Sequence, residues 1–258
     1  MNATYPISSF LAIKGPFIEA TYRAMNAWDA TKSPSENYAN IERQNSIGAP
    51  SSGWLTQFLK ATKRRYDFSG SDRPLVELVR QGWNLDEWRP VLLWHISQTE
   101  ALLRSFIAEW LYSQKQSGVV LITAESVEPF IRSEIEKHLG SSAKWSTETV
   151  KRVASGLLKT AVEFHLMRGR ASKEFESYRL SEKTLVYLLH VFLERDQSTK
   201  QVVEAIDWRI FHMTSTSVEE ELLRLHQYGK LRFERAGSFL ELTLPHPTMA
   251  DYMRSGAL

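Results

Sequence analysis

The chain of 258 residues carries 32 Lys and Arg against 30 Asp and Glu, so any strongly basic binding site must be a local one. Hydrophobic residues make up 43% and charged residues 24%, which is ordinary for a globular protein with a packed core. The absence of cysteine excludes disulfides, thiolate catalysis and cysteine zinc sites. Apolar runs fall far short of the roughly 20 residues of a membrane span. No targeting segment is visible, and we expect a cytoplasmic protein without membrane contact.

Hydrophobic periodicity and capping residues predict helices throughout the first half of the chain. They lie at about residues 16–29, 54–66, 72–82 and 91–115. The stretch 31–53 is rich in Ser, Asn and Pro, so we expect mostly loop there, with at most a short helix at 38–43. These elements form a predicted N-terminal helical domain, residues 1–117.

The second half alternates helices with short β-rich segments. After a β-rich stretch at 118–126, the expected helices lie at about 125–139, 147–165, 181–195, 198–206 and 216–228, with a hairpin at 166–180. In "LHQYGKLRFERAGSFLELTLP" (225–245), a helix end runs into a second hairpin with alternating apolar and polar residues. A winged helix ends in this way. We therefore expect a mainly α fold whose C-terminal half, 118–258, holds winged-helix-like units at about 125–180 and 181–245.

Two segments of this half share a plan of helix, aromatic residue and basic hairpin. They are residues 150–170 and 218–237, and in this alignment Leu166 matches Leu231, 65 positions later. A duplication of winged-helix units explains the match. The alternative is that any amphipathic helix followed by a hairpin looks like this.

The common catalytic templates are missing from the sequence. It has no P-loop, no metalloprotease pair of His at i and i+4, no acid-x-Lys nuclease motif and no Gly-x-Ser-x-Gly elbow. The seven His are scattered along the chain and are expected to be core or surface residues. We expect no catalytic residue, no metal and no cofactor, hence a protein that is not an enzyme. The alternative, an enzyme whose catalytic residues are scattered and match no known motif, ranks below the two binding functions considered next.

Local basic clusters are the candidate DNA-binding sites. Residues 141–180 carry 8 basic against 4 acidic residues, and the cations are expected on the helix 147–165 and the turn after it. This is the electrostatic footprint of duplex binding, although a solvated helix face looks the same. A second cluster closes the helix 54–66, where cations also complement the helix dipole. The candidate DNA-binding residues are Lys151, Arg152, Lys159, Arg168, Arg170, Lys173, Lys63, Arg64 and Arg65.

The later hairpin is a weaker DNA candidate. Residues 181–258 carry 9 basic against 11 acidic residues, and the run Glu219, Glu220 and Glu221 lies where base edges would be read. Carboxylates there would repel phosphate. They are expected in the first turn of their helix, where the dipole favours negative charge. We interpret this run as a candidate partner-binding surface.

The layout as a whole resembles the BrxA family of bacterial BREX phage-defence systems. The segments that carry the resemblance are "NIERQNSIGAPSSGWLTQFLKATKRRYDF" (40–68), "LLRSFIAEWL" (102–111), "KWSTETVKRVASGLLKTAVEFHLM" (144–167) and "WRIFHMTSTSVEEELLRLHQYGKL" (208–231).

The resemblance implies a mostly helical, non-enzymatic accessory protein that binds double-stranded DNA. It would work with other BREX proteins in a system that methylates host DNA and restricts phage. The DNA-binding residues named above come from charge counting in this sequence alone. The alternative is an adaptor whose winged-helix surfaces bind other defence components rather than DNA, which the acidic run favours.

Overall fold

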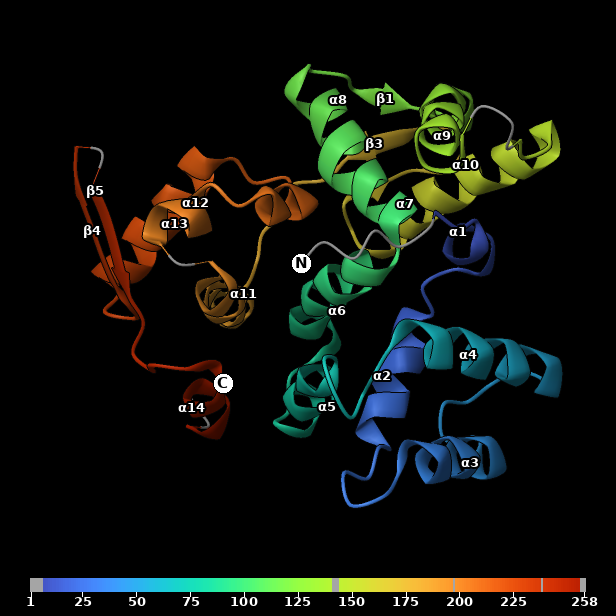
Figure 1. Cartoon of the computed structure of the whole chain (residues 1–258), viewed down its shortest axis with the longest axis horizontal. Coiled ribbons are helices and arrows are strands. Elements are labelled where there is room, and N and C mark those ends of the chain that lie inside the picture. The colour runs from blue at the N-terminus through green and yellow to red at the C-terminus, as the bar shows by residue number, and fades with distance from the viewer. Residues whose placement is uncertain (1–6, 141–143, 197, 238, 256–258) are drawn as a thin grey trace. The chain divides into compact units, whose positions relative to one another are not determined.

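The protein is mainly helical, as predicted, with a few short antiparallel strands. The computed structural model describes residues 7–140, 144–196, 198–237 and 239–255. The chain divides into two compact units, residues 1–177 and 178–258 (Figure 1). The division expected near residue 118 falls inside the first unit, because the strand just after it pairs with a strand at 173–175. No helix of the described residues is long and apolar enough to cross a membrane.

Five helices open the first unit, and side-chain caps decide where two of them begin. They are α1 (Phe10–Lys14), α2 (Ile18–Asn26), α3 (Pro34–Gln44), α4 (Ser52–Arg65) and α5 (Arg73–Arg80). Helix α3 occupies much of the expected loop, because Ser33 and Glu36 form a reciprocal capping box at its start. Ser51 accepts a hydrogen bond from the backbone of Trp54 at the start of α4. The sequence does not predict α1, since five residues are too few to reveal a helical period.

The single helix expected at 91–115 consists of four consecutive helical segments. They are α6 (Leu85–Thr99), α7 (Ala101–Arg104), the π-helix η1 (Ser105–Leu111) and α8 (Tyr112–Gln116). Asn84 and Glu87 form a capping box, which moves the start of α6 upstream of the predicted one. Between α6 and α7, Glu100 leaves helical geometry with φ −107° and ψ 82°. This break places a buried carboxylate beside Arg65 of α4.

The remainder of the first unit is a pair of helices combined with a three-stranded sheet. Its elements are β1 (Leu121–Ile122), α9 (Ala124–Leu139), α10 (Thr147–Glu163), β2 (Met167–Arg168) and β3 (Lys173–Phe175). All strand pairs are antiparallel, and the order in the sheet is β1–β3–β2. A strand that precedes the two helices thus joins the hairpin that follows them. Helix α10 buries an apolar stripe that includes Val153 and Leu157.

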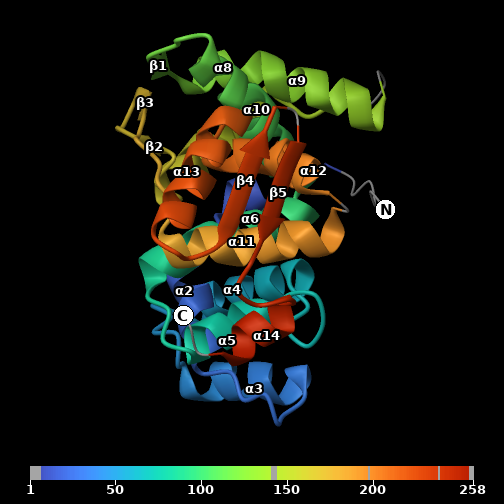
Figure 2. The ribbon, with the colours of Figure 1, turned by 90° about the vertical axis from the view of Figure 1, so that its left-hand side faces the viewer.

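The second unit is a small helical cluster with a two-stranded hairpin. Its elements are α11 (Glu182–Arg195), α12 (Thr199–Val203), the 3-10 helix η2 (Ile206–Phe211), α13 (Ser215–Gln227), β4 (Arg232–Ala236), β5 (Phe239–Thr243) and α14 (Met249–Arg254). Tyr187, Phe192, Trp208 and Phe211 lie fully buried in its core. Figure 2 shows β4 and β5 side by side. Ser238, which follows β4 in the predicted second hairpin, lies outside the described residues.

Helices α10 and α13 end in the same backbone geometry. Each closes with an aromatic C-cap, Phe164 or Tyr228, followed by a residue with positive φ, His165 at 61° or Gly229 at 67°. In each, the next amide donates to the carbonyl five residues earlier, at 2.9 Å in α10 and 3.0 Å in α13. The helix ends therefore correspond at a spacing of 64 residues. The Leu166 and Leu231 match, at 65, holds only after one residue is inserted.

Candidate nucleic-acid interface

The outward face of α10 carries the cations predicted for it. Lys151, Arg152 and Lys159 are all exposed. Two of them have carboxylate partners one turn away: Arg152 Nε lies 3.2 Å from Glu148, and Lys159 Nζ lies 3.5 Å from Glu163. Lys151 forms no ion pair with any residue that the structure describes. Burial raises the pKa of the Glu163 carboxyl, which the nearby Lys159 opposes.

The turn between β2 and β3 brings three further predicted cations together, with different roles. Arg168 donates from Nε and Nη2 to Glu174, its partner in the sheet register, at 3.3 and 3.2 Å. Lys173 is only half-exposed, and its ammonium donates to the backbone carbonyls of Gly169 and Arg170. Lys173 therefore stabilises the turn. The Arg170 side chain is exposed and has no ion pair within the described ranges.

At the end of α4, the three predicted cations divide between surface and interior. Lys63 and Arg64 are exposed and lie over aromatic rings, at 5.0 Å from the Tyr38 centroid and 4.8 Å from the Phe10 centroid. Such contacts leave the positive charge available to an anion. All three cations line a cleft of about 570 Å³ between α4, α5 and the end of α6.

Arg65 corrects the sequence-based prediction for this cluster. Its side chain is buried, with Nε 3.3 Å from Glu100 and Nη1 2.9 Å from the carbonyl of Gly15. Burial raises the pKa of the Glu100 carboxyl, and the Arg65 charge opposes that rise. A guanidinium held between a carboxylate and a carbonyl is not available to phosphate. The accessible part of this cluster is Lys63 and Arg64.

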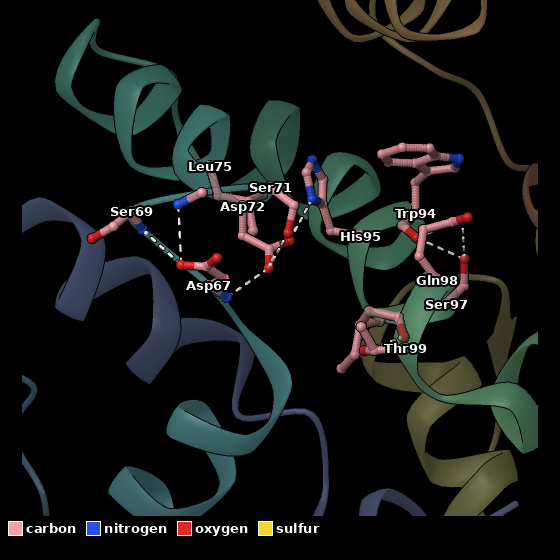
Figure 3. A network of polar contacts seen from close by, with 12 residues as sticks. Asp67, Ser69, Ser71, Asp72, Leu75, Trp94, His95, Ser97, Gln98 and Thr99 are labelled. Carbon is pink, nitrogen blue, oxygen red and sulfur yellow. Dashed lines mark hydrogen bonds and ion pairs between the residues drawn. The ribbon is translucent and has the colours of Figure 1, made fainter. Parts of the chain in front are cut away.

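A buried polar network fixes the wall of the same cleft. The Asp72 carboxylate contacts His95 Nδ1 at 2.7 Å and accepts from the Asp67 amide at 2.8 Å (Figure 3). Because its side chain is used in this way, Asp72 makes no capping bond to α5, although it occupies the N-cap position. Asp72 and His95 are both buried. The network connects the start of α5 to α6. It thereby holds in place the backbone that lines this side of the cleft.

In the second unit, the acidic run lies one turn further into its helix than predicted. Helix α13 begins at Ser215, and its first turn contains no acidic residue. Glu219 pairs with Arg235 of β4, and Glu221 lies 2.8 Å from Arg224. Glu220 is exposed without an ion-pair partner among the described residues. Stabilisation by the helix dipole is confined to the first turn, so it does not account for the acidic run at this position.

The predicted set omits two cations beside the start of α10, Arg132 and Lys144, which line a second cleft with Trp145. Charge counting missed Arg132 because it lies on α9, outside the basic segment 141–180. The described residues contain no cluster of His, Asp and Glu that could hold a metal ion.

The family model of BrxA matches residues 9–192 of this chain. The chain belongs to the BrxA family. That match covers most of the first unit's described residues, including both basic clusters, and it confirms the resemblance drawn from the sequence. Membership of the BrxA family associates the chain with BREX phage defence. No curated protein matches the chain.

Proposed function

We propose that this BrxA family member is a non-enzymatic accessory protein that binds double-stranded DNA through phosphate contacts. The observation that carries the proposal is the row of exposed cations along α10 that continues into the β2–β3 turn. Its members are Lys151, Arg152, Lys159, Arg168 and Arg170. Cations on a helix and on the hairpin after it form the surface that a duplex backbone requires.

The order of elements supports this assignment. A strand, two helices and a hairpin, with the first strand beside the hairpin, is the arrangement expected of a winged helix. In such a unit, the second helix enters the major groove. Helix α10 takes that position, and β2–β3 takes the position of the wing. The predicted wing cations Arg168 and Arg170 then lie where phosphates would pass.

The carboxylates paired with some of these cations do not argue against DNA binding. Arg152 and Arg168 form exposed pairs, and Lys159 is exposed although its partner Glu163 is half-buried. An exposed ion pair contributes only about 0–1 kcal/mol. Exchanging it for a phosphate costs little, whereas releasing condensed counterions from the duplex favours binding.

A duplex titration over a range of salt concentrations tests the proposal. If each of the exposed cations on α10 and the β2–β3 turn neutralises one phosphate, log K should fall against log salt with a slope of about −4 to −5. Unrelated duplexes should bind with similar affinity, because phosphate contacts carry little sequence information. A slope near zero, or no binding at low salt, would exclude this function.

A protein adaptor is the second candidate, and the surface of the second unit favours it. Large apolar side chains are exposed there, with Leu223 at 41%, Tyr228 at 67% and Phe239 at 63%. Exposed aromatic residues are typical of protein interfaces, and the exposed Glu220 of the same unit suits contact with a basic protein surface. We expect such contacts to be with other BREX proteins. Association that persists after the α10 cations are neutralised would support this role.

A further inference from the structure

The first unit has a second cleft, at the start of α10, one helical turn before Lys151 of the exposed cation row. It has a volume of about 450 Å³ and is formed where the end of α9 faces the residues that lead into α10. Among its lining residues are Arg132, Ile135, Glu136, Lys144, Trp145 and Thr147. Apolar surface from Ile135 and Trp145 is surrounded by polar and charged groups, which is typical of a small-ligand site.

Trp145 makes none of the polar or ring contacts, among the described residues, that would explain a tryptophan at this position. It is half-exposed, and it makes no hydrogen bond or ring contact with any described residue. By contrast, Trp83, Trp88 and Trp208 are fully buried in the cores of their units. Because the half-exposed indole lines the cleft, part of its apolar ring is accessible there, and stacking with another flat ring would remove that surface from water.

The charged side chains around the Trp145 ring indicate that a flat ligand bound there would carry a phosphate. Lys144 has no ion pair with described residues, and Arg132 has only a loose one, 3.8 Å from Glu128. Both are therefore available to a phosphate. The N-terminus of α10 adds partial positive charge on the same side. Glu136 supplies a carboxylate that can accept hydrogen bonds from an amino group.

We propose that this cleft takes one unpaired DNA base, stacked on Trp145, with its phosphate held by Lys144 and Arg132. The inference rests on the proposed DNA-binding function and deepens it. Lys151 lies one helical turn beyond Thr147, so the cleft continues the row of exposed cations on α10. A duplex along that row would pass an unpaired base, at a strand end or an opened pair, to the cleft. Stacking on an aromatic ring is tolerant of base identity.

The experiment compares three fluorescent probes with the full chain: a single-stranded deoxyadenosine hexamer, an abasic phosphodiester of the same length, and a short blunt duplex. Wild-type protein should bind the hexamer about tenfold more tightly than the abasic strand, because only the hexamer can stack. Trp145→Ala should remove that difference while duplex affinity stays the same. Trp145→Phe keeps an aromatic face and should retain part of the difference. Lys144→Gln should weaken both single-stranded probes alike.

The matched control is Arg168→Gln with Arg170→Gln, which should weaken duplex binding and leave the ratio of hexamer to abasic strand unchanged. Equal wild-type binding of the hexamer and the abasic strand overturns the inference, as does a ratio that survives in Trp145→Ala. If the wild-type protein does not bind the duplex but shows the Trp145-dependent ratio, the proposed function is overturned and this site is kept. Thermal melting of each variant distinguishes unfolding from loss of the site. If Trp145→Ala is unfolded, the ratio of hexamer to abasic strand in Trp145→Phe tests the inference instead.

Discussion

Gly156 of α10 lies directly against the backbone of Ala12 in α1, and a Cβ atom at position 156 would overlap the Ala12 carbonyl oxygen. Helix α1 has only five residues and could not stay helical by itself in water. Its position depends on packing against α10. The glycine in the middle of a 17-residue helix is thus the point where α1 packs against the helix that carries the cation row.

We predict that Gly156→Ala destabilises the first unit, although alanine is the better helix former. Helix propensity alone would stabilise α10 by about 1 kcal/mol. The overlap with a backbone atom cannot be relieved by a side-chain rotation, so a net loss of about 1–3 kcal/mol is expected. Urea unfolding measures the change. Ser155→Ala, at an exposed neighbouring position, is the control and should change stability by less than about 0.5 kcal/mol. A more stable Gly156→Ala protein would show that α1 does not pack as described.

Substitutions of the two neighbouring arginines at the end of α4 should affect different properties. Replacing Arg65 should lower stability, whereas replacing Arg64 should weaken DNA binding. Arg65→Ala leaves the Glu100 carboxyl buried without its charge partner, which should cost about 3–5 kcal/mol. Arg64→Ala removes an exposed cation over Phe10 and should cost less than about 1 kcal/mol while weakening DNA binding. Chemical denaturation and duplex titration of both variants provide the test. Replacing Arg65 and Glu100 together by Leu should recover much of the stability, and failure to do so would mean that the pair is not the source.

Arg65 also illustrates where sequence reasoning stops. Periodicity and capping predict most of the helices, because these signals are local. Position 65 lies in the last turn of α4, where a basic residue suits the helix dipole and looks like a surface cation. Its burial depends on Glu100, 35 residues later, at a break in a helix that the apolar pattern shows as continuous. Burial of this kind comes from tertiary packing.

Two further features depend on contacts or caps that hydrophobic periodicity does not reveal. They are the boundary between the two units and the position of the acidic run within α13. The pairing of β1 with β3 joins residues about 50 positions apart and keeps the stretch after 118 in the first unit. At α13, the helix begins at Ser215 after a capping box of Thr214 and Ser217, close to the predicted start, so the acidic run lies in the second turn and not in the first. The candidate cations on α10 were predictable, because the buried stripe of an amphipathic helix determines which residues face outward.

Two pairs of arginines on matching hairpins allow a controlled test of the proposed DNA surface. Arg168→Gln with Arg170→Gln should reduce the magnitude of the salt slope by about 2, because two phosphate contacts are lost. Glutamine avoids placing a negative charge opposite Glu174. The control is Arg232→Gln with Arg235→Gln on β4, where both arginines are exposed, as Arg168 and Arg170 are, and each is paired with a carboxylate. Duplex titrations that lose more affinity in the control would assign DNA binding to the second hairpin.

The second unit should lose stability in mild acid because of His190. Burial, aided by the nearby His246, lowers the pKa of the His190 imidazole to about 4. The folded state disfavours the protonated ring that the unfolded chain accepts below about pH 6.5. Stability from this residue is therefore complete above pH 6.5 and is lost as the pH falls towards 4. The ring stacks on Tyr252 of α14, with centroids 4.8 Å apart.

We predict a loss of about 2 kcal/mol between pH 7 and pH 5 from His190 alone. His190→Gln should be less stable than wild type at pH 7, since the stacking is lost, but its stability should depend less on pH. Urea unfolding at several pH values measures both effects. His246→Gln is the companion variant, and it should reduce the pH dependence only slightly. An unchanged pH dependence in His190→Gln would assign the acid sensitivity to other residues.

The two candidate functions differ most at the acidic run of α13. Glu220→Gln with Glu221→Gln should leave the fold intact and cost less than about 1 kcal/mol, because Glu220 is exposed and Glu221 has only a surface pair with Arg224. DNA affinity should stay level or rise modestly as local repulsion falls. Association with another BREX protein should drop if this helix is a partner surface. Thermal melting, duplex titration and pull-down with purified BREX proteins measure the three properties.

The matched control is Glu234→Gln with Glu241→Gln, which removes the same charge from the hairpin of the same unit. If both double variants weaken partner association equally, overall charge is responsible, and the α13 surface is not specific. If the Glu220 and Glu221 variant loses DNA binding while its melting temperature is unchanged, these carboxylates contact bases directly. In that case α13 is the recognition helix, and the cations of α10 serve another role.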